Sequence, residues 1–287
     1  MGKVCYQGYR GRFAPSPTGD LQLGNLRTAL ISWLKARIQK GKWLLRIDDL
    51  DIYRNRLGSI ESIQNDLIWL GLKWDNQIVL QSKRIKLYES VLASLKSRNL
   101  IYPCRCSRRI LFENSLSKNK CLIYSGKCRE LDLSCSSLDG KLPSLRLKVG
   151  SYYLKKCGDL ILRRADGFIS YNFATAVDDL SLGITEIIRG DDLIDATRYQ
   201  LAIIDAIGKT SLKYKFVPTL FTDDGRKMSK SNSDKGIKYF CSKGLSSSDV
   251  VGLLASSLKL VPPGAKLTLS ELLYDLMKDR SLFNRLF

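Results

Sequence analysis

Short apolar stretches alternate along the chain with longer stretches whose apolar residues recur every three to four positions. The short stretches are typical of β-strands, and the longer ones of helices with one buried face. Strands are predicted at 10–13, 43–47 and 184–188. Because strands and helices alternate in this way, the pattern favours an α/β fold, in which helices cover a sheet.

The predicted helices share one spacing of apolar residues. In the segment 25–40, Leu26, Leu30 and Leu34 fall on one face, and Asn25 is a candidate N-cap. Gly71 is a candidate C-cap for a second helix. The full set of helices is expected at 25–40, 59–70, 86–97, 174–182, 197–208, 246–258 and 268–277.

Periodicity fails between 103 and 135, where the chain carries many lysines and arginines. Five of the eight cysteines lie in this stretch: Cys104, Cys106, Cys121, Cys128 and Cys135. A cluster of thiols can fold a segment too small to have its own core if the thiolates bind a metal ion. Scattered free cysteines in a basic loop are the alternative.

Charge and the absence of membrane signals bound the class of protein. The 287 residues include 47 Lys and Arg against 28 Asp and Glu, a net charge of +19. Such an excess favours a polyanionic partner such as nucleic acid, although compositional bias can also produce it. No apolar run approaches the ~20 residues that span a bilayer, and 1–12 does not resemble a signal peptide. A cytosolic protein with reduced cysteines is expected.

The segment after the first predicted strand is a candidate anion site. Pro15-Ser16-Pro17-Thr18-Gly19 predicts a rigid turn, and Gly24-Asn25 predicts the start of a helix. The free N–H groups of a helix start attract a phosphate group. An ordinary connection between a strand and a helix is the alternative for this segment taken alone.

A second candidate phosphate site lies about two hundred residues further on. Lys227-Met228-Ser229-Lys230-Ser231 follows Asp223-Asp224-Gly225-Arg226, which predicts a turn. Two lysines and two serines on a loop can neutralise a triphosphate and the charge that develops on it during reaction. A solvated basic loop is the alternative.

Together the two motifs resemble the signatures of the class I glutamyl-tRNA synthetase family, over a segment from about 10 to 232. Gln22-Leu23-Gly24-Asn25 holds the place of the first signature, and 227–231 the place of the second. Gln22 stands where the family usually has histidine, and the chain contains no histidine. Further matching stretches run at 46–51, 171–172 and 185–193.

Only 56 residues follow Ser231, too few for the anticodon-binding region of a full glutamyl-tRNA synthetase. The chain instead resembles the shorter glutamyl-queuosine tRNA(Asp) synthetase family. The resemblance implies activation of L-glutamate with ATP and Mg²⁺, without tRNA, and transfer of glutamate to queuosine in the anticodon of tRNA(Asp). The alternatives are a non-catalytic tRNA-binding paralogue, a truncated enzyme that charges the tRNA 3′ end, and activation of aspartate.

The resemblance also implies a division of the chain into domains. A Rossmann-like catalytic domain is expected in two halves, at 1–102 and 151–235. A zinc-bearing α+β insertion is expected at 103–150 and a short helical tail at 236–287. No dimer face is evident, so a monomer is expected.

Site residues follow from the same resemblance. It assigns catalysis to Gln22, Lys227 and Lys230, and ATP binding to Gly24, Asn25 and Lys230. Asp48 stands where the family usually has glutamate, and its side chain is one methylene shorter; the alternative for Asp48 is a turn residue in an acidic cluster. The residues assigned to L-glutamate are Arg12, Phe13, Ala14, Pro15, Ser16, Asp48, Tyr171 and Arg189.

One structural Zn²⁺ is implied by the cysteine spacing of the short family. Cys104-Arg105-Cys106 and Tyr124-Ser125-Gly126-Lys127-Cys128 match its Cys-x-Cys and Tyr-x-x-x-Cys segments. The implied ligands are Cys104, Cys106, Tyr124 and Cys128. Cys121 is the alternative fourth ligand, because an all-cysteine site is also compatible with tetrahedral Zn²⁺.

Overall fold

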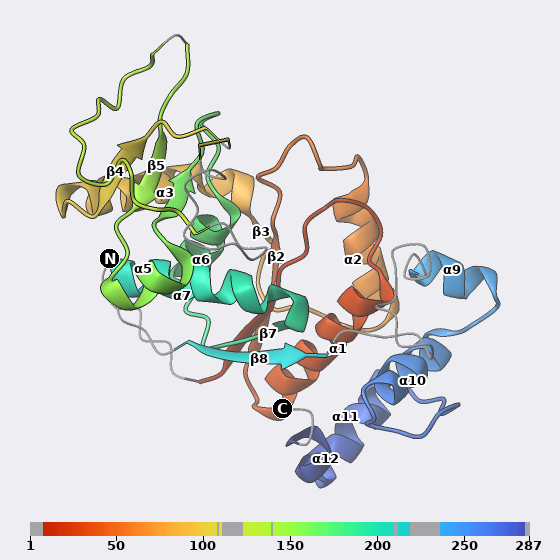
Figure 1. Cartoon of the computed structure of the whole chain (residues 1–287). Helices are drawn as coiled ribbons and strands as arrows, with labels where there is room; N and C mark the ends of the chain where they lie inside the picture. Colours follow the sequence, from red (N-terminus) through yellow and green to blue (C-terminus); the bar gives the residue numbers. More distant parts are fainter. Residues whose placement is uncertain are drawn as a thin grey trace. The chain divides into compact units, whose positions relative to one another are not determined.

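The computed structural model describes residues 8–107, 109–110, 123–138, 140–208, 212–218 and 236–284. These residues form two compact units (Figure 1). The first unit takes its described residues from 1–81, 183–193 and 212–287, and the second from 82–182 and 194–211. Each unit has its own sheet and its own helices, and each is described here by itself.

Parallel strands form the centre of the first unit. They are β1 (Arg10–Phe13), β2 (Lys42–Ile47), β3 (Val79–Leu80), β7 (Glu186–Gly190) and β8 (Lys213–Val217). β2 pairs with both β1 and β3, and β7 pairs with β8, in parallel throughout. The N–H of Thr185 donates to the carbonyl of Arg10 over 2.9 Å. This bond places the start of β7 beside β1.

Helices cover the strands of the first unit. They are α1 (Leu23–Ile38), α2 (Ser59–Trp69), α9 (Ile237–Ser242), α10 (Ser247–Ser257), α11 (Leu269–Lys278) and α12 (Arg280–Asn284). Leu26, Leu30 and Leu34 of α1 are buried in the core that the helices share with the strands. α1 contacts β1, β2 and β7, and it also contacts α10 and α11 of the C-terminal segment.

The second unit is built on an antiparallel sheet. Its elements are a 3₁₀ turn begun in the first unit (Gln81–Arg84), α3 (Ile85–Ser97), β4 (Ile101–Cys104), β5 (Ser144–Leu147), α5 (Ser151–Cys157), β6 (Leu160–Arg163), α6 (Tyr171–Ser181) and α7 (Ile194–Ile207). β5 pairs with both β4 and β6. The buried carboxylate of Asp178 in α6 accepts hydrogen bonds from Arg84 (2.6 Å) and Tyr88 (2.9 Å). These bonds tie α6 to α3.

The predicted α/β class is confirmed, and each predicted helix and strand is present: β1 has the predicted bounds, and the others have shifted ends. The prediction that Asn25 caps α1 is wrong, because the helix begins at Leu23 and Gln22 takes the extended N-cap conformation. Leu23 and Leu26 are both buried, so the earlier start brings one more leucine into the core. Within the described ranges, no helix has both the length and the apolar character needed to cross a membrane.

Candidate active site and metal centre

The turn that follows β1 is held in shape by backbone hydrogen bonds. The N–H of Asp48 donates to the carbonyl of Pro15 over 3.0 Å, and that of Arg56 to Pro17 over 2.9 Å. Both donors belong to the segment that follows β2. Gly19 then adopts a φ of +139°, a conformation that favours glycine. The predicted anion-binding turn is therefore fixed by the neighbouring strand and the loop after it.

The start of α1 has the properties expected of an anion site. The first N–H groups of a helix lack acceptors within the helix, and Gln22 makes no side-chain cap to them. Gly24 and Asn25 are exposed, and a Cβ atom added to Gly24 would meet nothing within 4 Å. A phosphate group can therefore approach the N–H groups of this turn, where the helix dipole attracts negative charge.

Two carboxylates flank the segment between the turn and α1. Asp20 accepts a hydrogen bond from Ser62 (2.7 Å) and pairs with Lys238 of α9 (3.0 Å). Asp66 of α2 is buried, and it accepts a hydrogen bond from the backbone N–H of Leu21. Burial, reinforced by the charge of Asp20, raises the pKa of Asp66 to about 6.

Asp48 is engaged by a partner that the sequence reading did not include. Arg46 Nε donates to Asp48 Oδ1 over 2.6 Å, and Arg46 Nη2 donates to Asp48 Oδ2 over 3.2 Å. Both side chains are buried. Residues two apart on an extended segment face the same side, so alternation along β2 was the available signal for this pair. The role of Asp48 in binding the glutamate ammonium remains a prediction.

The structure places the other residues assigned to glutamate in both units. In the first unit, Arg12 of β1 and Arg189 of β7 are buried, and the Arg189 guanidinium lies 5.0 Å from the centre of the Tyr214 ring. Tyr171 belongs to the second unit, where it opens α6 with its side chain partly exposed. The combination of Tyr171 with the two arginines remains a prediction.

The segment Phe13 to Ser16 divides into buried and exposed parts. The Phe13 ring stacks on Trp43 with centroids 6.2 Å apart, and Pro15 is also buried. Ala14 is half-buried, and Ser16 is exposed. Lys227 and Lys230 lie outside the described residues. Their roles in ATP binding and catalysis stay predictions from the resemblance.

Three cysteine thiols and one phenol converge in the second unit. The Sγ atoms of Cys104, Cys106 and Cys128 lie within 4.8 Å of one another, with 3.5 Å between Cys106 and Cys128. The Cys104 thiol donates to the Tyr124 hydroxyl over 3.4 Å, and this hydroxyl lies 3.7 Å from Cys106 Sγ. Tetrahedral Zn²⁺ with Zn–S bonds of about 2.3 Å holds thiolates about 3.8 Å apart. The four predicted donors therefore fit around one ion, while Cys121 lies outside the described residues.

The surroundings of Cys104 favour its thiolate, whereas burial raises the pKa of the neighbouring Cys106 thiol to about 11. Burial alone would raise the pKa of the Cys104 thiol. Hydrogen bonds from the Tyr124 hydroxyl and the Cys106 backbone, together with the charge of Arg146, outweigh burial and lower the Cys104 pKa to about 7. The Arg146 guanidinium lies 3.8 Å from the centre of the Tyr124 ring, and its Nη1 donates to the carbonyl of Asp159 over 2.7 Å.

Asp159 fastens the cysteine cluster to the sheet of the second unit. Its buried carboxylate accepts hydrogen bonds from Tyr102 (2.7 Å), Arg129 (3.2 Å) and the N–H of Val149 (2.9 Å). Arg129 directly follows Cys128, so this contact anchors the segment that carries the ligand. The sequence reading missed Arg129, Arg146 and Asp159, because the hydrogen bonds that hold them join residues 10 to 57 positions apart and follow no local pattern.

Gly158 allows the ligand segment to approach the sheet closely. A Cβ atom at Gly158 would lie 2.7 Å from the carbonyl oxygen of Tyr124 and 2.8 Å from its nitrogen. Gly158 also has a φ of +64°. A side chain at this position would therefore displace the backbone that presents Tyr124.

Comparison with known proteins places this geometry in a family. The model of the catalytic domain of class I tRNA synthetases for E and Q matches residues 9–152 and 145–244. A glutamyl-Q tRNA(Asp) synthetase of Prochlorococcus marinus (strain MIT 9313) is 54% identical over 276 residues, covering 96% of this chain and 90% of the relative. The protein of the same name from Acinetobacter baylyi is 39% identical and covers 78% of each chain.

Solved structures support the same fold. A glutamate tRNA ligase from Elizabethkingia meningosepticum, solved in complex with its amino acid, superposes with a TM-score of 0.77 at 23% identity. The match covers 92% of this chain but 64% of that ligase, so this chain spans less than two thirds of its length. On the family model and the close relatives together, the chain belongs to the glutamyl-Q tRNA(Asp) synthetase family of class I synthetases.

Proposed function

We propose that this chain activates L-glutamate with ATP in the absence of tRNA and then transfers the glutamate to queuosine in the anticodon of tRNA(Asp). The observation that carries the proposal is the braced turn after β1, followed by an α1 start whose N–H groups are accessible. Relatives named glutamyl-Q tRNA(Asp) synthetase, up to 54% identical, support the choice of substrates. We name as partners ATP with Mg²⁺, L-glutamate and tRNA(Asp).

The first step joins glutamate to AMP. A carboxylate oxygen of glutamate attacks the α-phosphorus of ATP, the bond to the β-phosphate oxygen breaks, and pyrophosphate leaves. The N–H groups around Gly24 and Asn25 attract the phosphates, and Lys227 and Lys230 neutralise the charge that develops. Gln22 donates an amide N–H to phosphate in place of an imidazole. No covalent bond to the enzyme is needed.

The amino acid requires charges of both signs. Arg12 and Arg189 supply guanidinium groups that match a carboxylate, and Tyr171 and Ser16 add hydrogen bonds. Asp48 accepts the ammonium while Arg46 fixes its carboxylate. In the second step a hydroxyl of the cyclopentene ring of queuosine attacks the acyl carbon, and AMP leaves.

One structural Zn²⁺ would be held by Cys104, Cys106, Cys128 and Tyr124, and it would cross-link a segment that has little apolar core of its own. Removal of the metal with a chelator should release this segment to proteolysis. Purified protein should contain one zinc per chain by elemental analysis. Protein that contains no metal, or whose protease resistance ignores chelation, contradicts the proposal. Cys121→Ser distinguishes the alternative ligand, because only an all-cysteine site would then lose zinc.

Pyrophosphate exchange and a transfer assay test the proposed reaction together. ATP–pyrophosphate exchange should require glutamate and proceed without tRNA. Labelled glutamate should then pass to tRNA(Asp) that contains queuosine and not to tRNA(Asp) that lacks it. Labelling that ignores queuosine would contradict the proposal and favour charging of a tRNA 3′ end. Exchange with aspartate instead of glutamate would show that Asp48 has changed the specificity.

A tRNA-binding paralogue without catalysis is the second candidate, and one observation favours it: Gln22 replaces the usual histidine. Absence of exchange with any amino acid, combined with binding of tRNA(Asp), would support it. A monomeric state and a cytosolic location also remain predictions.

A further inference from the structure

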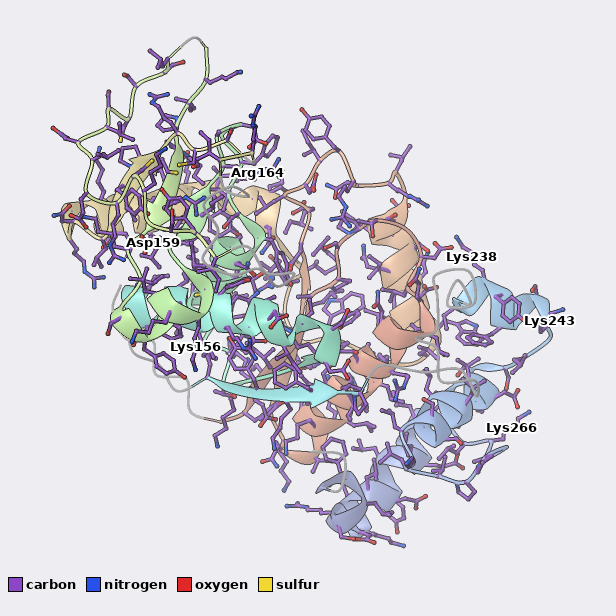
Figure 2. The ribbon with its side chains drawn as sticks, in the orientation of Figure 1. Lys156, Asp159, Arg164, Lys238, Lys243 and Lys266 are labelled. Atoms are coloured by element: carbon purple, nitrogen blue, oxygen red, sulfur yellow. The ribbon has the colours of Figure 1, made fainter. Side chains whose placement is uncertain are left out.

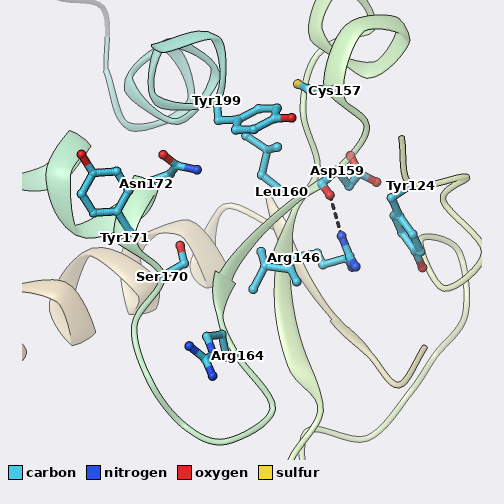
Figure 3. A pocket seen from close by; sticks show the side chains of 11 residues that line it. Tyr124, Arg146, Cys157, Asp159, Leu160, Arg164, Ser170, Tyr171, Asn172 and Tyr199 are labelled. Atoms are coloured by element: carbon cyan, nitrogen blue, oxygen red, sulfur yellow. Dashed lines mark hydrogen bonds between the residues drawn. The ribbon is translucent and has the colours of Figure 1, made fainter. Parts of the chain in front are cut away.

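A cavity of about 380 Å³ lies within the second unit, and all of its lining residues belong to that unit. Figure 3 shows it between β6, the starts of α6 and α7, and the segment that carries Tyr124. Tyr124, Tyr171 and Tyr199 line it together with the aliphatic side chains of Leu160 and Ile161. Its size falls in the range of sites for small organic ligands. Most of this lining consists of rings and aliphatic groups.

The buried charges of the wall are already used by the protein. The Asp159 carboxylate accepts three hydrogen bonds from within the unit. Arg146 lies on the Tyr124 ring and donates to the Asp159 carbonyl. The Cys157 thiol donates to the carbonyl of Tyr153 over 3.2 Å. The interior of this cavity is therefore suited to a ligand that is uncharged where it is buried.

Two neutral polar groups provide hydrogen bonds at one side of the cavity. Gln200 Nε2 donates to Asn172 Oδ1 over 3.3 Å, which turns the amide nitrogen of Asn172 inward, as Figure 3 shows. The Ser170 oxygen accepts the N–H of Phe173 as the cap of α6, so its hydroxyl hydrogen can be donated. Both groups thus present donors to a ligand that carries acceptors.

Arg164 provides a cation at the edge of the cavity. Its side chain is 51% exposed and is ion-paired with Asp166. A surface pair of this kind contributes little to stability, so an incoming phosphate can replace the carboxylate. Lys156, on the neighbouring α5, is also exposed (Figure 2). The tyrosine rings of the wall could contact the base of one nucleotide, and the cations at the edge could contact its phosphate.

We propose that this cavity binds one unpaired nucleobase of the RNA substrate, with its ring among the tyrosines and its phosphate near Arg164. Unpaired bases stack on aromatic side chains and accept hydrogen bonds on their edges. The inference rests on the proposed function for the identity of the RNA. It adds a site for the RNA that neither the family signatures nor the zinc segment assigns.

Free glutamate fits this cavity less well. It would bury a carboxylate and an ammonium, and the buried Asp159 carboxylate that could receive the ammonium is already hydrogen-bonded three times. Tyr171 is shared with the residues assigned to glutamate, so a base in the cavity would lie beside one of them. For this reason Tyr171 is left unchanged in the test.

Tyr199→Leu and Tyr199→Phe separate stacking from a general structural role. Affinity is measured by fluorescence anisotropy with the labelled anticodon stem–loop of tRNA(Asp), and exchange is measured without RNA. Tyr199→Leu should weaken RNA binding about tenfold, whereas Tyr199→Phe, which keeps the ring, should bind within about twofold of wild type. Exchange should be unchanged in both. Tyr274→Leu is the matched control, since Tyr274 is an exposed tyrosine of α11 in the first unit and is outside the cavity wall.

A second variant tests the same site in case Tyr199→Leu does not fold. Asn172→Leu removes the donor and should weaken RNA binding by a similar factor with unchanged exchange. If Tyr199→Leu and Asn172→Leu fold and bind RNA as wild type does, the nucleobase site is refuted. Failure of the proposed function looks different, because wild type itself then shows no exchange or no queuosine-dependent labelling. The anisotropy comparison still decides the cavity in that case.

Discussion

Arg46 and Asp48 place a pair of opposite charges where water has little access. Two charges buried together satisfy one another, but the loss of one partner leaves the other without compensation. The contribution of the pair to stability and the proposed role of Asp48 in binding glutamate can be measured separately.

Asp48→Ala should destabilise the protein by about 3–5 kcal/mol, because it removes the carboxylate that accepts two hydrogen bonds from the buried Arg46 guanidinium. Urea unfolding measures the change. The double variant Arg46→Met/Asp48→Leu removes both charges and should recover most of that loss. A single variant that costs less than about 1 kcal/mol would show that the pair is not buried as described.

Gln22→Ala should lower the rate of adenylate formation at least tenfold, because an amide N–H to phosphate is lost at the transition state. The effect on exchange should be much larger than the effect on the free energy of unfolding, since α1 forms without a side-chain cap from Gln22. Pyrophosphate exchange and thermal unfolding provide the two measurements. Exchange at the wild-type rate would exclude a phosphate role for Gln22.

Asp66 should make stability depend on pH. Its pKa of about 6 in the folded protein lies above its ordinary value of 3.8, so protonated Asp66 favours the folded state. This contribution is fully present below about pH 4 and is lost as pH rises through 6. Asp66→Asn should flatten the dependence over that window, measured by urea unfolding at several pH values. The matched control Asp75→Asn, at a more exposed carboxylate, should leave it in place.

At the scale of elements, the sequence predicted what is periodic and local. Helices such as α1 and α3 were predicted because their apolar residues repeat at helical spacing, with ends shifted by one or two residues. The short helices α5, α9 and α12 were missed, because five to seven residues are too few to establish a period. The antiparallel β4–β5–β6 sheet was missed as well, since its strands have only four residues each and the β4–β5 pairing joins residues 40 to 46 positions apart.

The candidate site shows the same division between local and distant partners. Motifs located Gln22, the turn before it and the cysteine cluster, because their chemistry lies in consecutive or closely spaced residues. The partners that hold those groups, such as Arg129 on Asp159, come from elsewhere in the chain. Nothing in the composition of either segment indicates that they meet.

Gly158→Ala should disturb the metal centre from outside it. The added Cβ would press on the Tyr124 backbone, and the positive φ adds strain, for a cost of about 1–3 kcal/mol. The midpoint temperature of thermal unfolding and the amount of zinc bound per chain should both fall. Gly150→Ala is the matched control, because Gly150 has an ordinary φ of −62° and open space around it. Equal behaviour of the two variants would contradict the close packing.

At the scale of the whole molecule, the net charge of +19 favours binding to the phosphates of RNA. Each phosphate that is neutralised releases counterions. The affinity for RNA should therefore fall at least tenfold between about 50 and 200 mM salt. Glutamate-dependent exchange without RNA should change much less over the same range. Anisotropy and exchange on one preparation make the comparison. RNA affinity that is insensitive to salt would argue against a phosphate-dominated interface.

The hydrogen bond between Thr185 and Arg10 affects how the protein folds during its synthesis. β1 leaves the ribosome well before the strand beside it, which follows 175 residues later. At about 5–20 residues per second, the ribosome needs roughly 10–35 s to synthesise the intervening residues. During this time that edge of β1 lacks its neighbouring strand. The helices α10 and α11 that pack on α1 emerge later still. The first unit therefore has an exposed strand edge while it is being synthesised. Such an edge can pair with another chain, so we expect chaperones to bind the nascent protein at this stage.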